Sequence, residues 1–279
     1  MTNFIIFLKT VSYLKISQIY YLVKRFFKVT NKVSSITFKK PITVPGWVNF
    51  SLYKRSIDNT RSVKFLNVYK VLEFPTDWNS DNHEKLWLYN LHYFNDFCAD
   101  NNAQDLIFLK KILSEWVEDN PYPDGVGWEP YPVSIRLVNV FKSILGGEKF
   151  DDKIYQSLYL QSKHLFLNQE KHLLGNHFFS NLKAILFAGI IFKDRNWINY
   201  SIGHLGTQID EQINADGGNF ELSPMYHALM LVDLLDIYNL IKAYDKKILT
   251  LQLHQLENKI FKMMNFYLSM LHMDDELSF

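Results

Sequence analysis

The feature that most constrains the fold is a helical spacing of apolar residues that runs from about residue 83 almost to the end of the chain. Side chains three and four positions apart lie on one face of a helix, so this spacing predicts amphipathic helices. Short loops separate the segments and place successive helices antiparallel. The predicted helices span about residues 83–99, 103–118, 132–145, 151–168, 176–193, 196–214, 224–244 and 246–272.

Antiparallel helix pairs in series can form a bundle, a solenoid or a ring of α/α pairs. No fixed repeat of the tetratricopeptide or HEAT kind is present, which argues against a solenoid. Residues 1–80 lack this regular helical spacing, because prolines and glycines interrupt them and β-branched residues cluster near 35–38. The sequence therefore predicts an all-α protein in two parts: an amphipathic helix and irregular connector over 1–80, with a short strand or two, and a helical domain over 81–279.

The amino terminus does not have the pattern of a secretory signal. Lys9 interrupts the apolar run 4–8, more basic residues follow, and no small-residue cleavage site is evident. We interpret the segment as an amphipathic helix that packs as an arm on the domain, with a position on a membrane surface as the alternative. No segment approaches the roughly 18 to 20 apolar residues of a membrane span.

Composition excludes several classes of function. The chain has 48% apolar residues, enough for a sizeable core, and its 30 basic and 29 acidic residues provide no global field for nucleic acid or an acidic membrane. Its one cysteine, Cys98, cannot form an internal disulfide and is interpreted as a buried small apolar residue. The phosphate-loop, dinucleotide, zincin and α/β-hydrolase motifs are missing, so we expect neither a cofactor nor a metal.

One cluster of polar residues lies at the start of an apolar predicted helix. Gly175 breaks the preceding segment, Asn176 and His177 follow it directly, and His172 lies shortly before it. Asn176 alone could be a helix N-cap. The two histidines favour a functional site.

A second cluster precedes the next long helix. Ser223 followed by proline is typical of a cap and a first-turn proline, which places Tyr226 and His227 in the opening turn. A tyrosine there is often a packed aromatic residue. The adjacent histidine, the upstream Glu221 and the double-glycine turn after Asp216 favour a site instead.

Aromatic residues complete the candidates. Trp128, Glu129 and Tyr131 lie in a loop ahead of a helix that carries Arg136. Aromatic faces suit the C–H faces of sugar rings, and an arginine can pair bidentately with a carboxylate, although Arg136 could equally bind internal carbonyl groups. His92 belongs to an aromatic helix that could line the same cavity.

Together these motifs resemble the N-terminal helical domain of the heparinase II/III-type polysaccharide lyases, in order over about residues 83–279. The resemblance rests on Trp87-Leu-Tyr-Asn-Leu-His-Tyr-Phe94, Trp128-Glu-Pro-Tyr-Pro-Val-Ser-Ile-Arg-Leu-Val-Asn139, Gly175-Asn-His177 and Asp216-Gly-Gly-Asn-Phe-Glu-Leu-Ser-Pro-Met-Tyr-His227. It implies an incomplete (α/α) toroid of antiparallel hairpins and β-elimination on uronate-containing polysaccharides. The family continues into a carboxyterminal β-sandwich domain, which we expect to be absent from this chain, so that the chain alone is weakly active or inactive.

The resemblance also implies roles for three residues. In that family an asparagine or histidine neutralises the uronate carboxylate and a tyrosine transfers the proton; by motif position these are Asn176, with His177 beside it, and Tyr226. The related alginate lyases also use an Asn-His pair here. Hydrogen-bond donors offset the charge that grows on the carboxylate as the C5 proton leaves. Since phenols ionise only near pH ~10, a tyrosine base needs cationic or donor neighbours, for which His227, His177 and Arg136 are candidates.

Two other functions stay open. A glycoside hydrolase on an α/α barrel would take its acid and base from Glu129, Asp216 and Glu221, and a carbohydrate-binding helical domain would bind without reaction. For the lyase, the expected partner is an acidic polysaccharide, and the resemblance implies a periplasmic or extracellular location without a recognisable signal peptide. The expected substrate-binding residues are His92, Trp128, Glu129, Tyr131, Arg136, Glu221 and His227.

Overall fold

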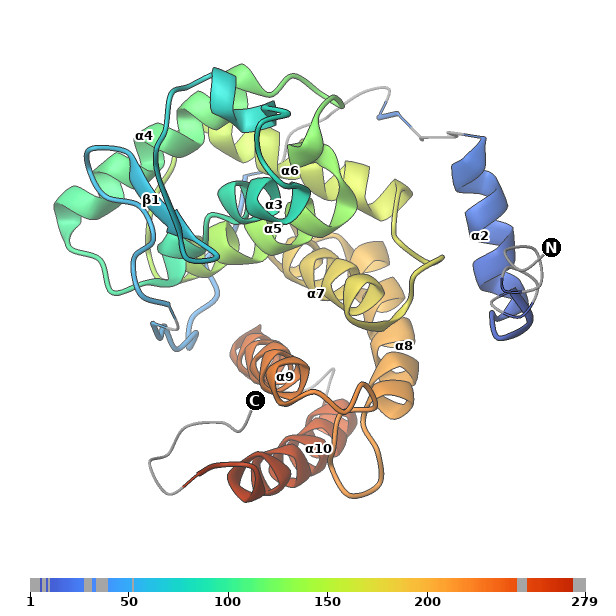
Figure 1. Cartoon of the computed structure of the whole chain (residues 1–279). Coiled ribbons are helices and arrows are strands. Elements are labelled where there is room, and N and C mark those ends of the chain that lie inside the picture. Colours follow the sequence, from blue (N-terminus) through green and yellow to red (C-terminus); the bar gives the residue numbers. More distant parts are fainter. Residues whose placement is uncertain are drawn as a thin grey trace.

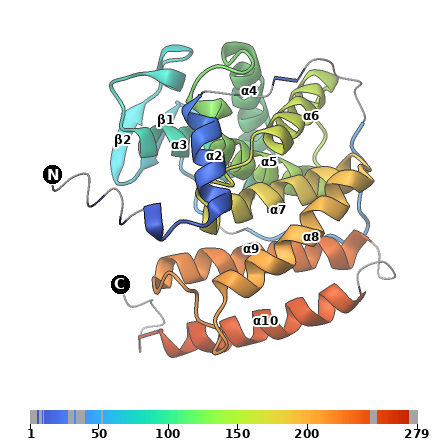
Figure 2. The same cartoon turned by 90° about the vertical axis from the view of Figure 1, so that its right-hand side faces the viewer.

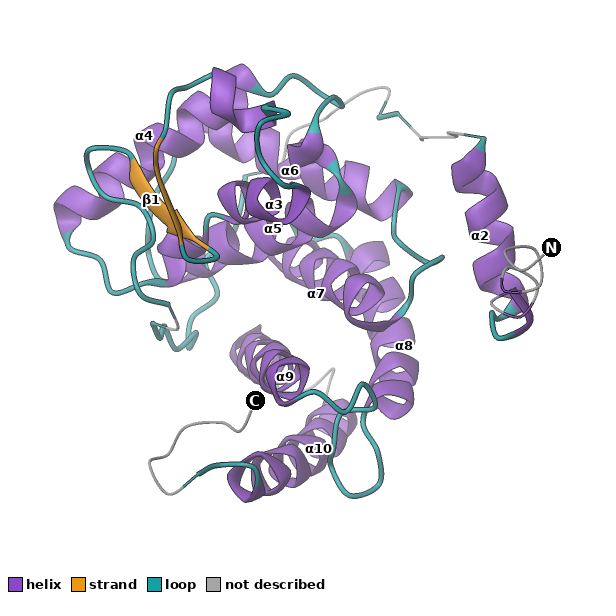
Figure 3. Cartoon of the chain, in the orientation of Figure 1, coloured by secondary structure: helices purple, strands orange, loops and turns teal. Residues whose placement is uncertain are grey.

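A computed structural model of the chain describes residues 6, 9, 11–27, 32–33, 40–51, 53–244 and 250–272. Within these ranges helices dominate, and the strands form one two-stranded sheet (Figures 1 and 3). The α-helices are α2 (Ile16–Phe26), α3 (Lys85–Tyr93), α4 (Ala103–Asp119), α5 (Pro130–Leu145), α6 (Asp152–Leu167), α7 (Gly175–Ile191), α8 (Arg195–Gln212), α9 (Pro224–Tyr244) and α10 (Thr250–Ser269). The predicted all-α class is confirmed.

Helix α7 is the centre of the domain. It packs against α5, α6, α8 and α9, and every residue from 178 to 191 is buried. Figure 1 shows α7 as one member of an open arc of helices, in which α9 and α10 pack together as the last pair. Figure 2 shows the same pair from the side. Because α7 is buried on all sides and is mostly apolar, it can only be stable with neighbours on all sides.

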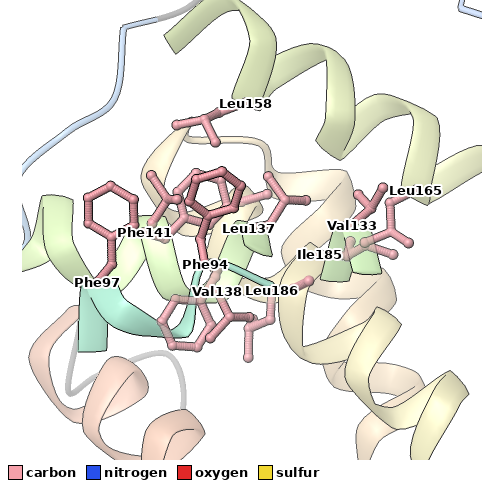
Figure 4. Packing of buried hydrophobic residues seen from close by; sticks show 14 of the residues in the cluster. Phe94, Phe97, Val133, Leu137, Val138, Phe141, Leu158, Leu165, Ile185 and Leu186 are labelled. Atoms are coloured by element: carbon pink, nitrogen blue, oxygen red, sulfur yellow. The ribbon is translucent and has the colours of Figure 1, made fainter. Parts of the chain in front are cut away.

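The apolar core lies where α5, α6 and α7 meet. Leu137 and Phe141 of α5 pack with Leu158 of α6 and with Ile185 and Leu186 of α7 (Figure 4). All five side chains are almost completely shielded from solvent. Burial of each stabilises the fold by about 1.5–3 kcal/mol relative to exposure.

Local signals in the sequence explain where several helices begin. Asn102 and Asp105 form a reciprocal capping box at α4, and the Asp151 carboxylate accepts the Ile154 N–H (2.8 Å) at α6. Ser223 Oγ accepts the Tyr226 N–H (3.4 Å) at α9, as the serine-proline pair predicts. The predicted bounds of these helices agree with the structure to within a few residues.

The helix predicted over 83–99 is shorter than expected. Phe94 adopts a left-handed conformation (φ 54°), which ends α3, and a 3-10 turn, η2 (Asn95–Cys98), follows. The turn aims Asp96 at the connector, where its carboxylate accepts the backbone N–H groups of Ser56 (2.6 Å) and Ile57 (3.1 Å). This tertiary contact outweighs the local helical spacing.

The amino-terminal part contains α2 and a hairpin of β1 (Ser62–Phe65) and β2 (Val68–Val71). Leu66 and Asn67 both have positive φ (51° and 61°), as in the two-residue turns that suit the twist of a hairpin. The strand expected near 35–38 lies outside the described residues. Two further 3-10 turns, η1 (Thr76–Asn79) and η3 (Val126–Trp128), precede α3 and α5. None of the helices in the described ranges is long and apolar enough to cross a bilayer.

Candidate active site

A pocket that is open to solvent lies between α5, α7 and α9. Both loops that the sequence marks as functional end beside it: one leads into α5, and the other joins α8 to α9. The polar lining residues are Tyr53, Tyr131, Ser134, Asn139, Lys142, Asn176, Ser180, Lys183, Gln212, Asn219, Glu221, Tyr226, Asp233 and Asp236. Of the ten predicted site residues, Tyr131, Asn176, Glu221 and Tyr226 therefore meet in one pocket.

Asn176 reaches the pocket because of an unusual helix start. Leu174 and Gly175 both have positive φ (59° and 53°), so the chain turns sharply before α7. The Leu174 side chain cannot cap the helix, and Asn176 lies inside the first turn, so its amide is not used as an N-cap. Gln212 Nε2 holds the turn by donating to the Gly175 carbonyl (3.3 Å). A strained helix entrance that presents an amide to a pocket is typical of a functional site.

His177 lies at the edge of this pocket. Its Nδ1 is 3.2 Å from Glu170 Oε2, and its ring packs against that of Tyr131 with the centroids 4.3 Å apart. The Glu170 N–H in turn donates to Asn181 Oδ1 (2.7 Å). With Nδ1 directed at the carboxylate, Nε2 is the nitrogen that His177 can direct at a ligand.

Tyr226 lies in the first turn of α9 and lines the pocket with Glu221. The turn that precedes them packs against α10: Gly217 has φ +94°, and a Cβ there would lie 2.4 Å from the Lys262 carbonyl oxygen. Glu221 Oε1 comes close to the start of α7, only 3.7 Å from where a Cβ on Gly175 would be. The loop thus joins the two helix starts that carry Asn176 and Tyr226.

His227 is not at the pocket, although it follows Tyr226 directly. Its Nδ1 accepts the Asn219 N–H (3.3 Å), and its Nε2 donates to the Met263 carbonyl (3.0 Å). The ring is buried, and burial lowers its pKa. His227 is therefore a neutral buried residue that ties the loop to α10 and lies outside the pocket.

Arg136 is also part of the interior. Its guanidinium stacks 3.9 Å above the Trp116 ring and donates to Gln161 Oε1 (2.9 Å) and to the carbonyls of His92 (3.0 Å) and Gly127 (2.8 Å). The side chain is completely buried, and burial lowers its pKa to about 9. Of the two roles open to it in the sequence, the structure supports internal carbonyl binding.

His92 and Trp128 lie beside Arg136 and not in the pocket. Trp128 Nε1 donates to the Asn120 carbonyl (3.1 Å). His92 Nδ1 accepts from Trp116 Nε1 (2.8 Å), so its Nε2 carries the proton and donates to the Trp78 carbonyl (2.9 Å). Both side chains are buried, so neither can contact a substrate without rearrangement. Glu129 instead pairs with Lys85 (2.9 Å) and accepts from the Tyr89 hydroxyl.

The burial of His92 predicts a pH dependence of stability. Burial, with the nearby Arg136 charge, lowers the pKa of His92 to about 3 from 6.5. Between these values the unfolded state binds a proton that the folded state does not, so the free energy of unfolding falls as the pH falls. The amide of His92→Gln can keep both hydrogen bonds. We expect the free energy of unfolding of this variant to fall less between the two pH values than that of the unchanged chain. Urea unfolding at ~pH 7 and ~pH 5 measures it.

His254→Gln is the matched control, because the His254 side chain is 72% exposed. It should unfold with the pH dependence of the unchanged chain. If the free energy of unfolding changed with pH equally in the unchanged chain and in His92→Gln, the prediction would be contradicted.

Sequence reasoning missed a network of buried charges at the base of the pocket. Lys183 Nζ donates to Asp233 Oδ1 (2.7 Å) and Asp236 Oδ2 (2.6 Å), and Lys142 Nζ lies 2.8 Å from Asp236 Oδ1. Burial opposes the charge on Lys183, but the two aspartates outweigh it and raise its pKa. Burial likewise opposes the Asp236 charge, and the two lysines outweigh it and lower its pKa. The sequence did contain one signal for this network, the charged Lys183 within the mostly apolar helix α7.

Tyr53 is another residue that the motifs did not indicate. It comes from the connector and lines the pocket. Although 37% of the residue is exposed, desolvation of its hydroxyl raises its pKa to about 12. Burial also raises the pKa of Tyr131 well above the ordinary range of a phenol. Both phenols are therefore neutral hydrogen-bonding groups at neutral pH.

Comparison with known proteins gives a consistent result. The model of the family described as "Heparinase II/III N-terminus" matches residues 76–277. A heparin-sulfate lyase of Pedobacter heparinus is 33% identical over 146 residues, which cover 47% of this chain and 21% of the lyase. The chain thus spans about a fifth of the length of this curated relative.

Solved structures show the same fold. The crystal structure of a heparan sulfate lyase from Pedobacter heparinus matches 78% of this chain and 38% of its own, with a TM-score of 0.51 and 20% identity. That of heparinase III matches 91% of this chain and 43% of its own, with a TM-score of 0.53 and 15% identity. The shared part is the helical toroid domain, so the predicted incomplete (α/α) toroid is confirmed.

Proposed function

Because the chain belongs to the heparinase II/III family, through the N-terminal domain of that family, we propose that its pocket is the toroid side of a polysaccharide lyase site. The substrate class is a uronate-containing polysaccharide, and the reaction is β-elimination. The observation that carries the proposal is the meeting of Asn176, Glu221, Tyr131 and Tyr226 in one pocket, with His177 at its edge.

The polar groups of the pocket suit the first step of such a reaction. The Asn176 amide would donate to the uronate carboxylate and offset the charge that develops as the C5 proton leaves. His177 Nε2 would add a second donor in the doubly protonated form of the ring, in which Nδ1 donates to Glu170. Glu170 fixes the orientation of His177 through Nδ1. The half-buried Tyr131 packs on the same ring and restricts its movement.

Tyr226 would move the proton. In its ionised form the phenol oxygen takes the C5 proton, the C5–H electron pair forms the C4–C5 double bond, and the bond from C4 to the glycosidic oxygen breaks. The phenol then returns the proton to the leaving oxygen, so the base is regenerated and no water is consumed. A tyrosine base needs a cationic or donor neighbour that favours its ionised form. His227 and Arg136 bind interior carbonyls and do not line the pocket. The cationic groups that do line it are Lys142 and Lys183.

The glycoside hydrolase alternative has weaker support. It requires two carboxylates across one bond. Of its three candidates, Glu221 lines the pocket, Glu129 pairs with Lys85, and the Asp216 carboxylate accepts the Gly218 N–H (2.9 Å) within its own turn. The other pocket carboxylates, Asp233 and Asp236, are paired with lysines.

Product analysis tests the proposal. The chain is incubated with uronate-containing polysaccharides, and ultraviolet absorbance and mass spectrometry follow the products. We expect products with a C4–C5 double bond, at low rates, each pair lacking the water that hydrolysis would add. Hydrated products would support the hydrolase instead, and tight oligosaccharide binding without any cleavage would support a binding domain.

A further inference from the structure

The near-zero net charge of the chain hides a strong separation of charge along the sequence. Ten of the 30 basic residues and none of the 29 acidic residues lie in residues 1–57, and the first acidic residue is Asp58. Helix α2 belongs to this basic segment. Five of the ten, Lys9, Lys15, Lys24, Arg25 and Lys28, belong to α2 or to the residues next to it in the sequence, whereas Lys40 and Arg55 pair with Asp152 and Asp105. The stretch of chain around α2 is therefore basic although the molecule as a whole is nearly neutral.

Helix α2 and its flanking residues expose an apolar stripe. Within α2, Ile16, Tyr20, Val23 and Phe26 recur at spacings of three and four, so they lie along one face. The exposed fractions of the stripe residues run from 52% for Val23 to 88% for Tyr13. The stripe consists of Tyr13, Ile16, Tyr20, Val23, Phe26 and Phe27.

The opposite face of α2 attaches the helix to the domain. Lys15 pairs with Glu211, Gln18 Nε2 donates to the His172 carbonyl (3.2 Å), and Leu14 and Ile19 are half-buried. Helix α2 lies at one edge of the molecule in Figure 1 and faces the viewer in Figure 2. The predicted packing arm thus holds the domain with one face and directs its apolar stripe outward.

We propose that α2 binds the surface of an anionic phospholipid bilayer. The stripe would enter the boundary between headgroups and acyl chains, and the basic residues of the segment would attract the anionic headgroups. An acidic polysaccharide could satisfy the charges but has no apolar phase for Ile16 or Val23. With 11 residues, α2 is too short to span a bilayer and would lie in its plane.

Vesicle flotation of the whole chain tests this inference. We expect the chain to float with vesicles of phosphatidylcholine mixed with phosphatidylglycerol, to float much less with phosphatidylcholine alone, and to be released by high salt. Val23→Ser combined with Phe27→Ser should weaken binding by about tenfold or more, since two apolar side chains no longer enter the bilayer.

The matched control removes equally exposed apolar side chains outside the basic segment. Phe261 (65% exposed) and Leu268 (61%) on α10 are replaced by serine, and binding should not change. Thermal unfolding of each variant checks that it is folded. Equal binding to neutral vesicles, equal loss in the control, or binding of soluble heparan sulfate but not of vesicles would overturn the inference. It does not depend on the proposed lyase activity, which is measured separately.

Discussion

Tyr226→Phe is expected to reduce the rate of unsaturated uronate formation by roughly 10²–10⁴-fold, the usual contribution of a positioned acid or base. The substitution removes one oxygen from a side chain that lines the pocket and leaves the ring in place. Binding of a uronate oligosaccharide should therefore persist. Initial rates of absorbance increase and an equilibrium binding titration measure the two quantities separately.

Tyr238→Phe provides the control on the same helix. Its hydroxyl donates to Glu257 (2.7 Å) at an exposed position outside the pocket, so the same oxygen is lost without a catalytic consequence. If Tyr226→Phe retained more than about a tenth of the activity, the phenol would not be the proton carrier.

Asp236→Ala is expected to reduce the free energy of unfolding by about 3–5 kcal/mol, because it leaves buried lysine charge without its partner. Asp236 is the carboxylate shared by Lys142 and Lys183, and the side chains of all three are at most 6% exposed. Urea unfolding followed by circular dichroism measures the loss.

Glu118→Ala is the matched control for the buried network. Glu118 pairs with Lys153 (2.7 Å), but both side chains are more than half exposed. Such a pair contributes about 0–1 kcal/mol, so this variant should unfold almost like the unchanged chain. Similar losses in both variants would show that burial does not set the strength of the Asp236 network.

Local patterns in the sequence were sufficient for most of the helical fold. Asp151 and Ser223 are caps where the sequence predicts caps, because capping depends on residues within one turn. The left-handed Phe94 was not predictable in the same way. Its conformation follows from contacts of Asp96 with the connector some 40 positions earlier, which one sequence does not display.

Local patterns also predicted part of the candidate site, but not the residues whose roles depend on tertiary contacts. Asn176 and Tyr226 lie at helix starts beside glycine-containing turns, and both line the pocket. His227 and Arg136 have the same local pattern but bind interior carbonyls. A polar residue next to aromatic ones has the same appearance in a sequence whether it binds a substrate or stabilises a buried loop. The three catalytic roles stay predictions until the variants are measured.

The burial of α7 on all sides has a consequence for biosynthesis. Helix α7 leaves the ribosome after α5 and α6 but before α8 and α9, which cover its remaining sides. Until about residue 244 has emerged from the ribosome, a nascent chain leaves apolar side chains of α7 exposed. Chaperone binding should therefore concentrate on chains arrested between the ends of α7 and α9 and should decline once the second hairpin is complete.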